Sequence, residues 1–332
     1  MKQIVSFLKS LSKFIGTAWM IIAKLIGSFV LLIIVLVVLL VILIKPDAEF
    51  NQSSNIVESG GEEQIAYARL NGEILQVADD SFVGFNPFVI TPERTRKLVN
   101  SLIIDEDVKA IVLKINSPGG SVVASEEIYQ QLKKLAEHKP VVIIFGDVAA
   151  SGGYYIATAA DRIVASPATL TGSIGVIMLS PDLSGLYEKV GVEINTYKSG
   201  TFKDIGSTSR AATAEEVAIL QSLIDDSYQL FVDRVSAERD IEMTKLKSIA
   251  DGRVYSGVQA YENGLIDELG GLDKAIALAS ELANISDPTV IEYTYGGNFF
   301  SSFIQSNFGA LVPNSQLESL LPKKMGLYYL WE

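Results

Sequence analysis

A serine that follows an apolar run is the first residue of this chain whose position suggests chemistry. Ser151 lies in the run Gly-Asp-Val-Ala-Ala-Ser-Gly-Gly-Tyr-Tyr at 146–155, after a predicted buried strand at 141–145 and before a helical stretch. A serine presented at a strand-to-helix turn is a candidate nucleophile. The chain has no cysteine, and its only histidine, His138, lies in a charged run before that strand. If Ser151 is catalytic, we expect its general base to be a lysine.

A glycine turn supplies candidate donors for the oxyanion that such a nucleophile would generate. An apolar strand at 112–115 is followed by Asn-Ser-Pro-Gly-Gly at 116–120. Glycine lets a backbone N–H approach a ligand closely, so Gly119 and Gly120 are both candidates. An ordinary strand-to-helix turn is the alternative interpretation, because Pro-Gly-Gly is common in turns.

These two turns belong to a longer series of motifs that covers most of residues 65–290. The others are Leu-Thr-Gly-Ser-Ile-Gly-Val at 170–176, Lys-Ser-Gly-Thr-Phe-Lys-Asp at 198–204, Ala-Asp-Gly-Arg-Val-Tyr-Ser-Gly at 250–257 and Gly-Leu-Ile-Asp at 264–267. In this order and spacing they resemble the serine peptidases of the ClpP/crotonase fold. The resemblance is greater to the signal peptide peptidase A family, peptidase family S49, in its short, single-domain form.

The resemblance implies a fold and a set of site residues. The fold is α/β, a ClpP/crotonase-like spiral of β-β-α units, which we place at 63–290. By position in the motifs, the nucleophile is Ser151, the general base is Lys203, the serine that hydrogen-bonds the lysine is Ser173, and the oxyanion hole is formed by the backbone N–H groups of Gly119 or Gly120 and of Gly152. A lysine acts as a base only if desolvation lowers its pKa several units from about 10.4, and Phe202 is an apolar neighbour that would contribute.

The sequence contains other candidate lysines for the role of general base. Lys198 is a rival base on the same loop, but the run before it resembles the end of a strand, and the family motif matches Lys203. Two Ser-x-x-Lys spacings, Ser6 to Lys9 and Ser10 to Lys13, lie in the basic N-terminal arm and are chance matches.

The elements that must position these residues alternate between strands and helices, which predicts an α/β domain. Strand-like runs lie at 65–70, 110–115, 141–145, 162–165, 174–179 and 192–197, and helical patterns lie at 125–135, 154–160 and 272–282. A longer helix is predicted after Thr213, because Glu216 completes a capping box with it. The last segment, 291–332, does not continue this alternation of strands and helices and is predicted to be a docking or regulatory tail.

The N-terminal part predicts a membrane anchor. Residues 25–44 carry no charge and are mostly Leu, Ile and Val, and as a helix they would be about 30 Å long, the thickness of a bilayer core. The arm at 1–24 is basic, and no acid appears before Asp47, which predicts a cytoplasmic N-terminus and an extracytoplasmic domain on the cell membrane. A cleavable signal peptide is the alternative, but no small-x-small site follows residue 44. Residues 45–62 are predicted to form a polar stalk.

Composition excludes several classes of function. The formal net charge of −12 makes nucleic acid an unsuitable partner. The absence of cysteine and of a His-Glu-x-x-His motif argues against thiol catalysis and a zinc hydrolase, so we expect no metal and no cofactor.

The sequence therefore predicts a membrane-anchored serine endopeptidase with a Ser-Lys dyad. The resemblance implies remnant signal peptides and other unfolded or apolar peptides as substrates, the lipid bilayer as a partner, and a homo-oligomer, octameric in short forms, whose serine and lysine come from neighbouring protomers. The alternatives are a related Ser-Lys peptidase with one specific membrane-protein substrate, a non-catalytic peptide-binding scaffold, and an acyl-CoA enzyme of the crotonase type.

Overall fold

The computed structural model describes residues 16–36, with gaps at 18, 23, 30 and 34, and residues 50–77, 88–295 and 328–330. The chain divides into two compact units, 1–48 and 49–332. The described residues of the first unit are helical, and no helix in the described parts of the chain is long and apolar enough to span a bilayer. The predicted span at 25–44 lies only partly within these residues, since 37–44 fall outside them, as does most of the basic arm.

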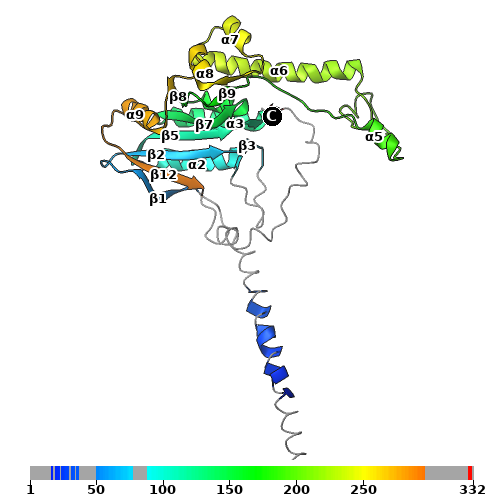
Figure 1. Ribbon diagram of the computed structural model, residues 1–332, viewed down its shortest axis with the longest axis horizontal. Helices are drawn as coiled ribbons and strands as arrows, with labels where there is room; N and C mark the ends of the chain where they lie inside the picture. Colours follow the sequence, from blue (N-terminus) through cyan, green and yellow to red (C-terminus); the bar gives the residue numbers. More distant parts are fainter. Residues whose placement is uncertain are drawn as a thin grey trace, which may run out of the picture. The chain divides into compact units, whose positions relative to one another are not determined.

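The second unit is built on a large sheet whose central strands are parallel (Figure 1). The sheet order is β1-β12-β2-β5-β7-β8-β11, with β9 and β10 attached beside β7. The bounds are β1 Phe50–Glu58, β2 Gln64–Asn71, β5 Val108–Ser117, β7 Val141–Ala150, β8 Arg162–Ala165, β9 Leu170–Gly172, β10 Val254–Ser256, β11 Glu268–Leu269 and β12 Thr289–Tyr295. The central strands are apolar runs buried on both faces, as parallel strands between helices must be.

A second, smaller sheet and the helices complete the packing. Its order is β13-β6-β3-β4, with β3 Glu73–Ile74, β4 Val89–Ile90, β6 Gly119–Ser121 and β13 Tyr328–Leu330. The strand β2 is followed by β3, β4 and the helix α2 (Pro92–Ile104), and β5 is followed by β6 and α3 (Val122–Ala136). A β-β-α unit, β5-β6-α3, and a unit with one more strand, β2-β3-β4-α2, are therefore present, and the predicted α/β class is confirmed.

Helices cover both faces of the large sheet. On one face, α2, α3 and α4 (Gly152–Ala157) enclose the larger apolar core, and on the other face α9 (Leu272–Ala283) covers a smaller one. The helices α7 (Met243–Ile249) and α8 (Gly257–Asn263) follow the longest helix, α6 (Ala214–Arg239). The predicted capping box opens α6: the Thr213 hydroxyl accepts from the Glu216 N–H at 3.2 Å, and the Glu216 carboxylate accepts from the Thr213 N–H at 2.8 Å.

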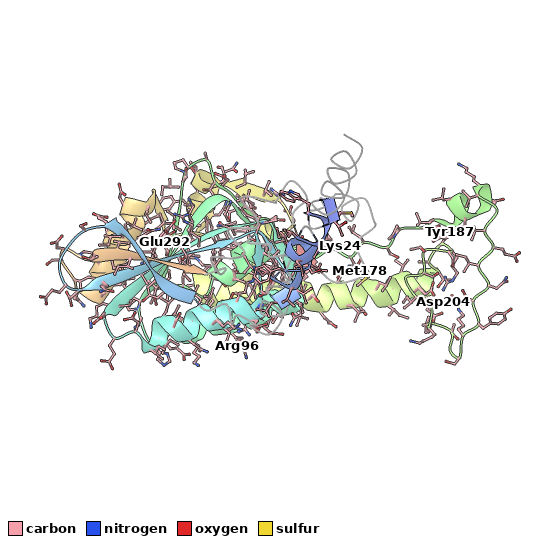
Figure 2. All side chains as sticks on the ribbon, turned by 90° about the horizontal axis from the view of Figure 1, so that it is seen from below. Lys24, Arg96, Met178, Tyr187, Asp204 and Glu292 are labelled. Carbon is pink, nitrogen blue, oxygen red and sulfur yellow. The ribbon has the colours of Figure 1, made fainter. Side chains whose placement is uncertain are left out.

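An arm at 177–212, which contains the short helix α5 (Ser184–Lys189), lies at the N-terminal end of α6, away from the sheet (Figures 1 and 2). The predicted strands at 174–179 and 192–197 lie in or beside this arm and are wrong: apart from one isolated bridge residue, Ile177, neither segment has strand structure. Ile174 packs in the larger core directly after β9, but the remaining residues run into the arm and do not join either sheet. Their apolar side chains, Ile177, Leu179, Val192 and Ile194, are exposed instead.

The large sheet extends past both predicted limits of the domain. Residues 50–58, assigned from sequence to the stalk, form β1 and pair antiparallel with β12, which runs into the segment assigned to the tail. The polar sequence of β1 suits a sheet edge that faces solvent. Residues 45–49 of the stalk and most of the tail lie outside the described residues.

Candidate active site

Ser151 occupies a strained turn between β7 and α4. Its φ is +53°, a conformation that costs a non-glycine residue about 1–3 kcal/mol, and the residue is 1% exposed. The Ser151 N–H donates to the carbonyl of Gly172 at 2.7 Å. Although Ser151 is the N-cap of α4, its hydroxyl makes no capping bond, and within the described residues its buried Oγ has no hydrogen-bond partner. A buried, uncommitted hydroxyl at a strained turn is what a nucleophile requires.

The two glycine turns predicted as oxyanion donors pack against each other beside this serine. Gly119 has φ +101°, and a Cβ added to it would lie 2.7 Å from the Gly152 nitrogen. A Cβ added to Gly152 would lie 3.2 Å from the Gly120 nitrogen and 2.7 Å from Ser125 Oγ. Only glycine fits here, so the sequence of both turns is dictated by their contact. The Gly119 N–H donates to Ser117 Oγ at 3.1 Å, whereas the Gly120 and Gly152 nitrogens lie where the two turns contact each other.

Ser173 lies next to Ser151 through the backbone. It follows Gly172, whose carbonyl accepts the Ser151 N–H, because β9 pairs with the end of β7 in parallel register. Ser173 is 7% exposed and has φ +49°, and its N–H donates to the Arg253 carbonyl at 2.9 Å. The structure therefore brings together the predicted nucleophile, the predicted supporting serine and the glycine turns.

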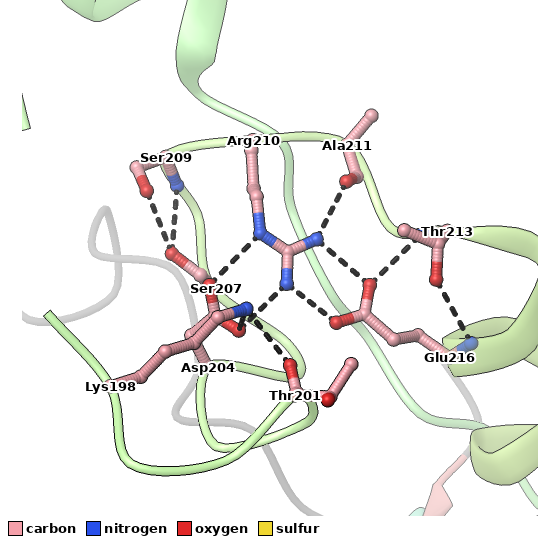
Figure 3. Close-up of polar contacts among 9 residues, drawn as sticks. All are labelled: Lys198, Thr201, Asp204, Ser207, Ser209, Arg210, Ala211, Thr213 and Glu216. Atoms are coloured by element: carbon pink, nitrogen blue, oxygen red, sulfur yellow. Dashed lines mark hydrogen bonds and ion pairs between the residues drawn. The ribbon is translucent and has the colours of Figure 1, made fainter. Parts of the chain in front are cut away.

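Lys203 lies elsewhere, on the arm. It is exposed, and its side chain has no polar partner within the described residues. The rival Lys198 is committed: its Nζ donates to the Asp204 carboxylate at 2.6 Å and to the Thr201 carbonyl at 2.8 Å (Figure 3). The Lys198 amine is thus already engaged within the arm, whereas the Lys203 amine has no such partner in the described part of the chain.

An ion-pair network holds the loop that carries Lys203. Arg210 donates to Asp204 at 2.9 and 3.0 Å and to Glu216 at 2.5 and 2.8 Å, and so joins the arm to the first turn of α6 (Figure 3). Hydrogen bonds from Arg210 and then from the Thr213 N–H lower the pKa of Glu216 to about 2. Hydrogen bonds from Arg210 and Lys198 lower the pKa of Asp204.

The length of α6 separates Lys203 from Ser151 within one chain. Glu216 lies at the arm end of this helix, and Phe231, which contacts Tyr155 with a ring-centroid distance of 5.0 Å, lies at the sheet end. The 15 residues between Glu216 and Phe231 span about 22 Å of helix axis. Tyr155 in turn donates its N–H to the Ser151 carbonyl at 2.8 Å. A single chain thus presents a nucleophile and a lysine at opposite ends of α6.

Sequence reasoning missed the side chains that support α4. The Tyr155 hydroxyl hydrogen-bonds the Glu126 carboxylate, Arg234 pairs with Glu126 at 2.9 Å, and the same guanidinium lies 4.8 Å from the Tyr129 ring centroid. Burial, followed by the hydrogen bond that Tyr155 donates to Glu126, raises the pKa of Tyr155, so the phenol stays neutral. These residues come from three helices, so no local sequence motif predicts their contact.

The structure contains no candidate metal centre in its described parts: no cluster of three or more His, Asp or Glu side chains is placed to hold an ion.

The sequence matches two protein-family models and several known proteins. The family model of peptidase family S49 matches residues 133–286, and the Clp protease model matches residues 89–170. The chain is 49% identical over 183 residues to a Synechocystis protein named as a protease, a match that covers 55% of this chain and 66% of the relative. It is 40% identical over 228 residues to the chloroplastic serine protease SPPA of Arabidopsis thaliana, covering 68% of this chain and 33% of the relative.

Among solved structures, a ClpP1 mutant from Listeria monocytogenes matches with a TM-score of 0.42 and 18% identity, covering 63% of this chain and 94% of that chain. The chain spans between a third and two thirds of the length of the two relatives.

Proposed function

The chain belongs to peptidase family S49, the signal peptide peptidase A family, and on that basis we propose that it is a membrane-anchored serine endopeptidase that uses Ser151 and Lys203 as a catalytic dyad. The observation that carries this proposal is the state of Ser151. Its hydroxyl is buried at a strained turn and is uncommitted within the described residues, and the residue directly precedes Gly152, where the two glycine turns meet. A serine that served only packing would not need the positive φ.

The proposed reaction is acyl transfer in two steps. The amine of Lys203, deprotonated by burial in the assembly, accepts the proton of Ser151 as Oγ attacks a peptide carbonyl carbon. The oxyanion that forms accepts hydrogen bonds from the N–H groups of Gly152 and of Gly119 or Gly120, and Gly120 is the better placed of these two because the Gly119 N–H is bound to Ser117. The leaving amine takes the proton, and water, deprotonated by the same lysine, then hydrolyses the ester and restores the serine.

Assembly into a homo-oligomer is part of the proposal. In one chain Lys203 is exposed at the far end of α6, so a neighbouring copy must bring a lysine to each serine and cover it. The arm suits this role because its apolar side chains are exposed: Leu186 is 54% exposed, Val190 63% and Tyr197 95%. Apolar side chains gathered in this way mark an interaction surface. A ring, octameric as in short members of the family, would enclose the sites and admit only extended chains.

The membrane location and the substrates are proposed from the sequence. The uncharged run at 25–44 and the basic arm before it favour an anchor with the catalytic domain outside the cytoplasm. An anchored peptidase would act where apolar peptides collect, so remnant signal peptides and other unfolded apolar chains are the proposed substrates.

The test is hydrolysis of an unfolded protein and of a leucine-rich fluorogenic peptide by the full chain in detergent. Ser151→Ala and Lys203→Ala are each expected to reduce kcat by at least about 10³-fold, because each removes a partner of the covalent step. The matched control is Lys189→Ala, which removes an exposed lysine of the same arm outside the ion-pair network and should retain turnover. Equal cleavage by the Ser151→Ala variant would overturn the role of Ser151, and absence of cleavage by the unmodified chain would favour a peptide-binding scaffold.

A further inference from the structure

Strand β7 contains a bulge shortly before it reaches Ser151. Its parallel pairing with β5 is regular up to Phe145 and resumes at Ala149, and over this interval β7 advances by four residues while β5 advances by two. The bulge, residues 146–148, lies where β7 exchanges one neighbour, β8, for another, β9. A bulge bends its strand and re-aims the side chains that follow it.

The end of β7 holds Ser151 between two parts of the candidate site. On one side, β9 places the Gly172 carbonyl to accept the Ser151 N–H at 2.7 Å. On the other side, Ala149 pairs with Ser117 of β5, just before the turn at Gly119. A slip of β7 by one residue would move Ser151 about 3.3 Å along both neighbours and turn its side chain to the opposite face. The bulge therefore determines whether the nucleophile lies beside the glycine turns.

The side chain of Asn116 holds this bulge from the β5 side. Asn116 is the residue of β5 opposite the bulge, and its Oδ1 accepts from the Val148 N–H at 3.1 Å. The contact is close, since a Cβ added to Gly146 would lie 2.8 Å from Asn116 Cβ and Oδ1. The Asn116 carbonyl in turn accepts from the Gly72 N–H at 2.9 Å. The carboxamide thus gives a main-chain N–H an acceptor where the regular ladder is interrupted.

The side chain of Thr169 holds the same bulge from the β9 side. Its hydroxyl donates to the Gly146 carbonyl at 2.8 Å, and the residue is buried. Further along β7, the hydroxyl of the buried Thr171 donates to the Ala149 carbonyl at 2.6 Å. The path of β7 from the bulge to Ser151 therefore depends on side chains from both neighbours as well as on the ladder between the strands.

We propose that Asn116 and Thr169 are positioning residues for the nucleophile: they fix the bulge, and the bulge places Ser151 against the glycine turns. Their role is to place the nucleophile, so their loss should slow the covalent step and leave substrate binding unchanged. This inference rests on the proposed peptidase function and extends it to two residues outside the dyad and the oxyanion donors.

Kinetics of the full chain in detergent test this role, with turnover expressed per chain of assembled protein. Asn116→Ala should lower kcat on the leucine-rich peptide about 30- to 100-fold and change KM less than about threefold, because a misplacement of about 1 Å costs about 100-fold in rate. Asn116→Asp keeps an acceptor for the Val148 N–H and should bring kcat to within about fivefold of wild type.

The matched control is Asn71→Ala. Asn71 pairs with Asn116 across β2 and β5, and its side chain makes no hydrogen bond within the described residues, so kcat should stay within about twofold of wild type.

Thr169 gives an independent pair of variants if Asn116→Ala fails to fold. Thr169→Val keeps the shape but removes the hydroxyl and should lower kcat at least about tenfold at constant KM, whereas Thr169→Ser keeps the donor and should stay within about threefold of wild type. A purely structural role would lower the yield of assembled protein and not its kcat. Unchanged kcat in the Ala and Val variants, or an equal loss in the Asp and Ser variants, would overturn the positioning role.

Hydrogen exchange separates this inference from the proposed function, because it needs no turnover. The amides of Val148 and Ser151 are followed by mass spectrometry of fragments that cover 146–151. Asn116→Ala should make both exchange at least about tenfold faster, and Asn116→Asp should restore their protection. That pattern, with no cleavage by any chain including the unmodified one, would overturn the peptidase and leave the placement of Ser151 standing. Cleavage by the unmodified chain, with exchange unchanged in Asn116→Ala, would leave the peptidase standing and overturn the positioning role.

Discussion

Complementation between two inactive variants tests whether the dyad is shared between copies. Within one chain, Lys203 is tied to the arm end of α6, about 22 Å of helix from the residues that contact Tyr155, far beyond the ~3 Å needed for proton transfer. A Ser151→Ala chain retains a competent arm, and a Lys203→Ala chain retains a competent serine. Mixed oligomers should therefore contain complete sites that neither variant forms alone.

The size of the recovery follows from random assembly of the two chains in equal amounts. Half of the sites carry Ser151, and half of the neighbouring arms carry Lys203, so about a quarter of the wild-type activity per chain is expected. A dyad within one chain would give no recovery.

The assay uses co-expression of the two variants with different affinity tags, two-step purification of mixed oligomers, and hydrolysis of the leucine-rich peptide. The matched control co-expresses wild type with a double Ser151→Ala, Lys203→Ala chain. A dyad shared between copies predicts about a quarter of full activity for this pair as well, whereas a dyad within one chain predicts about half. No recovery in mixed oligomers of confirmed equal composition, together with half activity in the control, would refute the reasoning.

Three further outcomes follow from the same structure. Gly119→Ala should lower kcat at least about 100-fold, because its Cβ would collide with the Gly152 nitrogen. In the control, Gly264→Ala, the residue has φ +81° and its Cβ would make only a van der Waals contact with Ile241. This variant should keep kcat and lose about 1 kcal/mol of stability. Glu216 has its pKa lowered from 4.5 to about 2, so its bonds to the arm are fully present above pH 4.5 and are lost as the pH falls through about 2. Pepsin should therefore cut residues 177–212 near pH 2 and not at pH 4.5. Equal cutting at the two pH values would contradict this. Tyr154→Phe should lower the free energy of unfolding by about 1–2 kcal/mol, since the buried hydroxyl donates to the Leu265 carbonyl, whereas Tyr197→Phe, which is exposed, should leave it unchanged in denaturant titration.

The sequence was most informative where a local pattern dictates backbone geometry. The small residues around Ser151 predicted a tight strand-to-helix turn, and the structure has one, with positive φ at Ser151. The capping box at Thr213 also formed as predicted, because all of its hydrogen bonds lie within four residues. Such features need no knowledge of distant contacts, which is why short motifs were sufficient.

The sequence was misleading where apolar residues are exposed. Runs at 174–179 and 192–197 have the composition of buried strands, yet in the single chain neither run joins a sheet, and only Ile174 of their apolar residues is buried. Apolar composition indicates that a segment will be buried, but it does not identify the partner. If assembly covers the arm, as proposed, the apolar pattern correctly indicated burial, but the burial is against a neighbouring copy and not within a sheet.

Contacts between distant segments could not be predicted from one sequence. The pairing of Tyr329 with Gly120 joins residues more than two hundred positions apart, and the strand is only three residues long. The aromatic composition of the tail suggested docking, but it gave no indication of where. The same holds for Glu126 and Tyr155, whose contact depends on how α3 and α4 pack.

The two halves of the proposed site are held by different forces, and this has a consequence for activity. The serine and the glycine turns are fixed inside the chain by a buried apolar core and by backbone contacts that only glycine permits. The lysine loop is held by partly exposed ion pairs, and a cavity of about 260 Å³ lies between the arm and α6. Such pairs are weakened by salt. The serine half is thus preorganised in every chain. In the proposed oligomer, a neighbour would bring the lysine half to it, so assembly rather than folding would control when the peptidase becomes active.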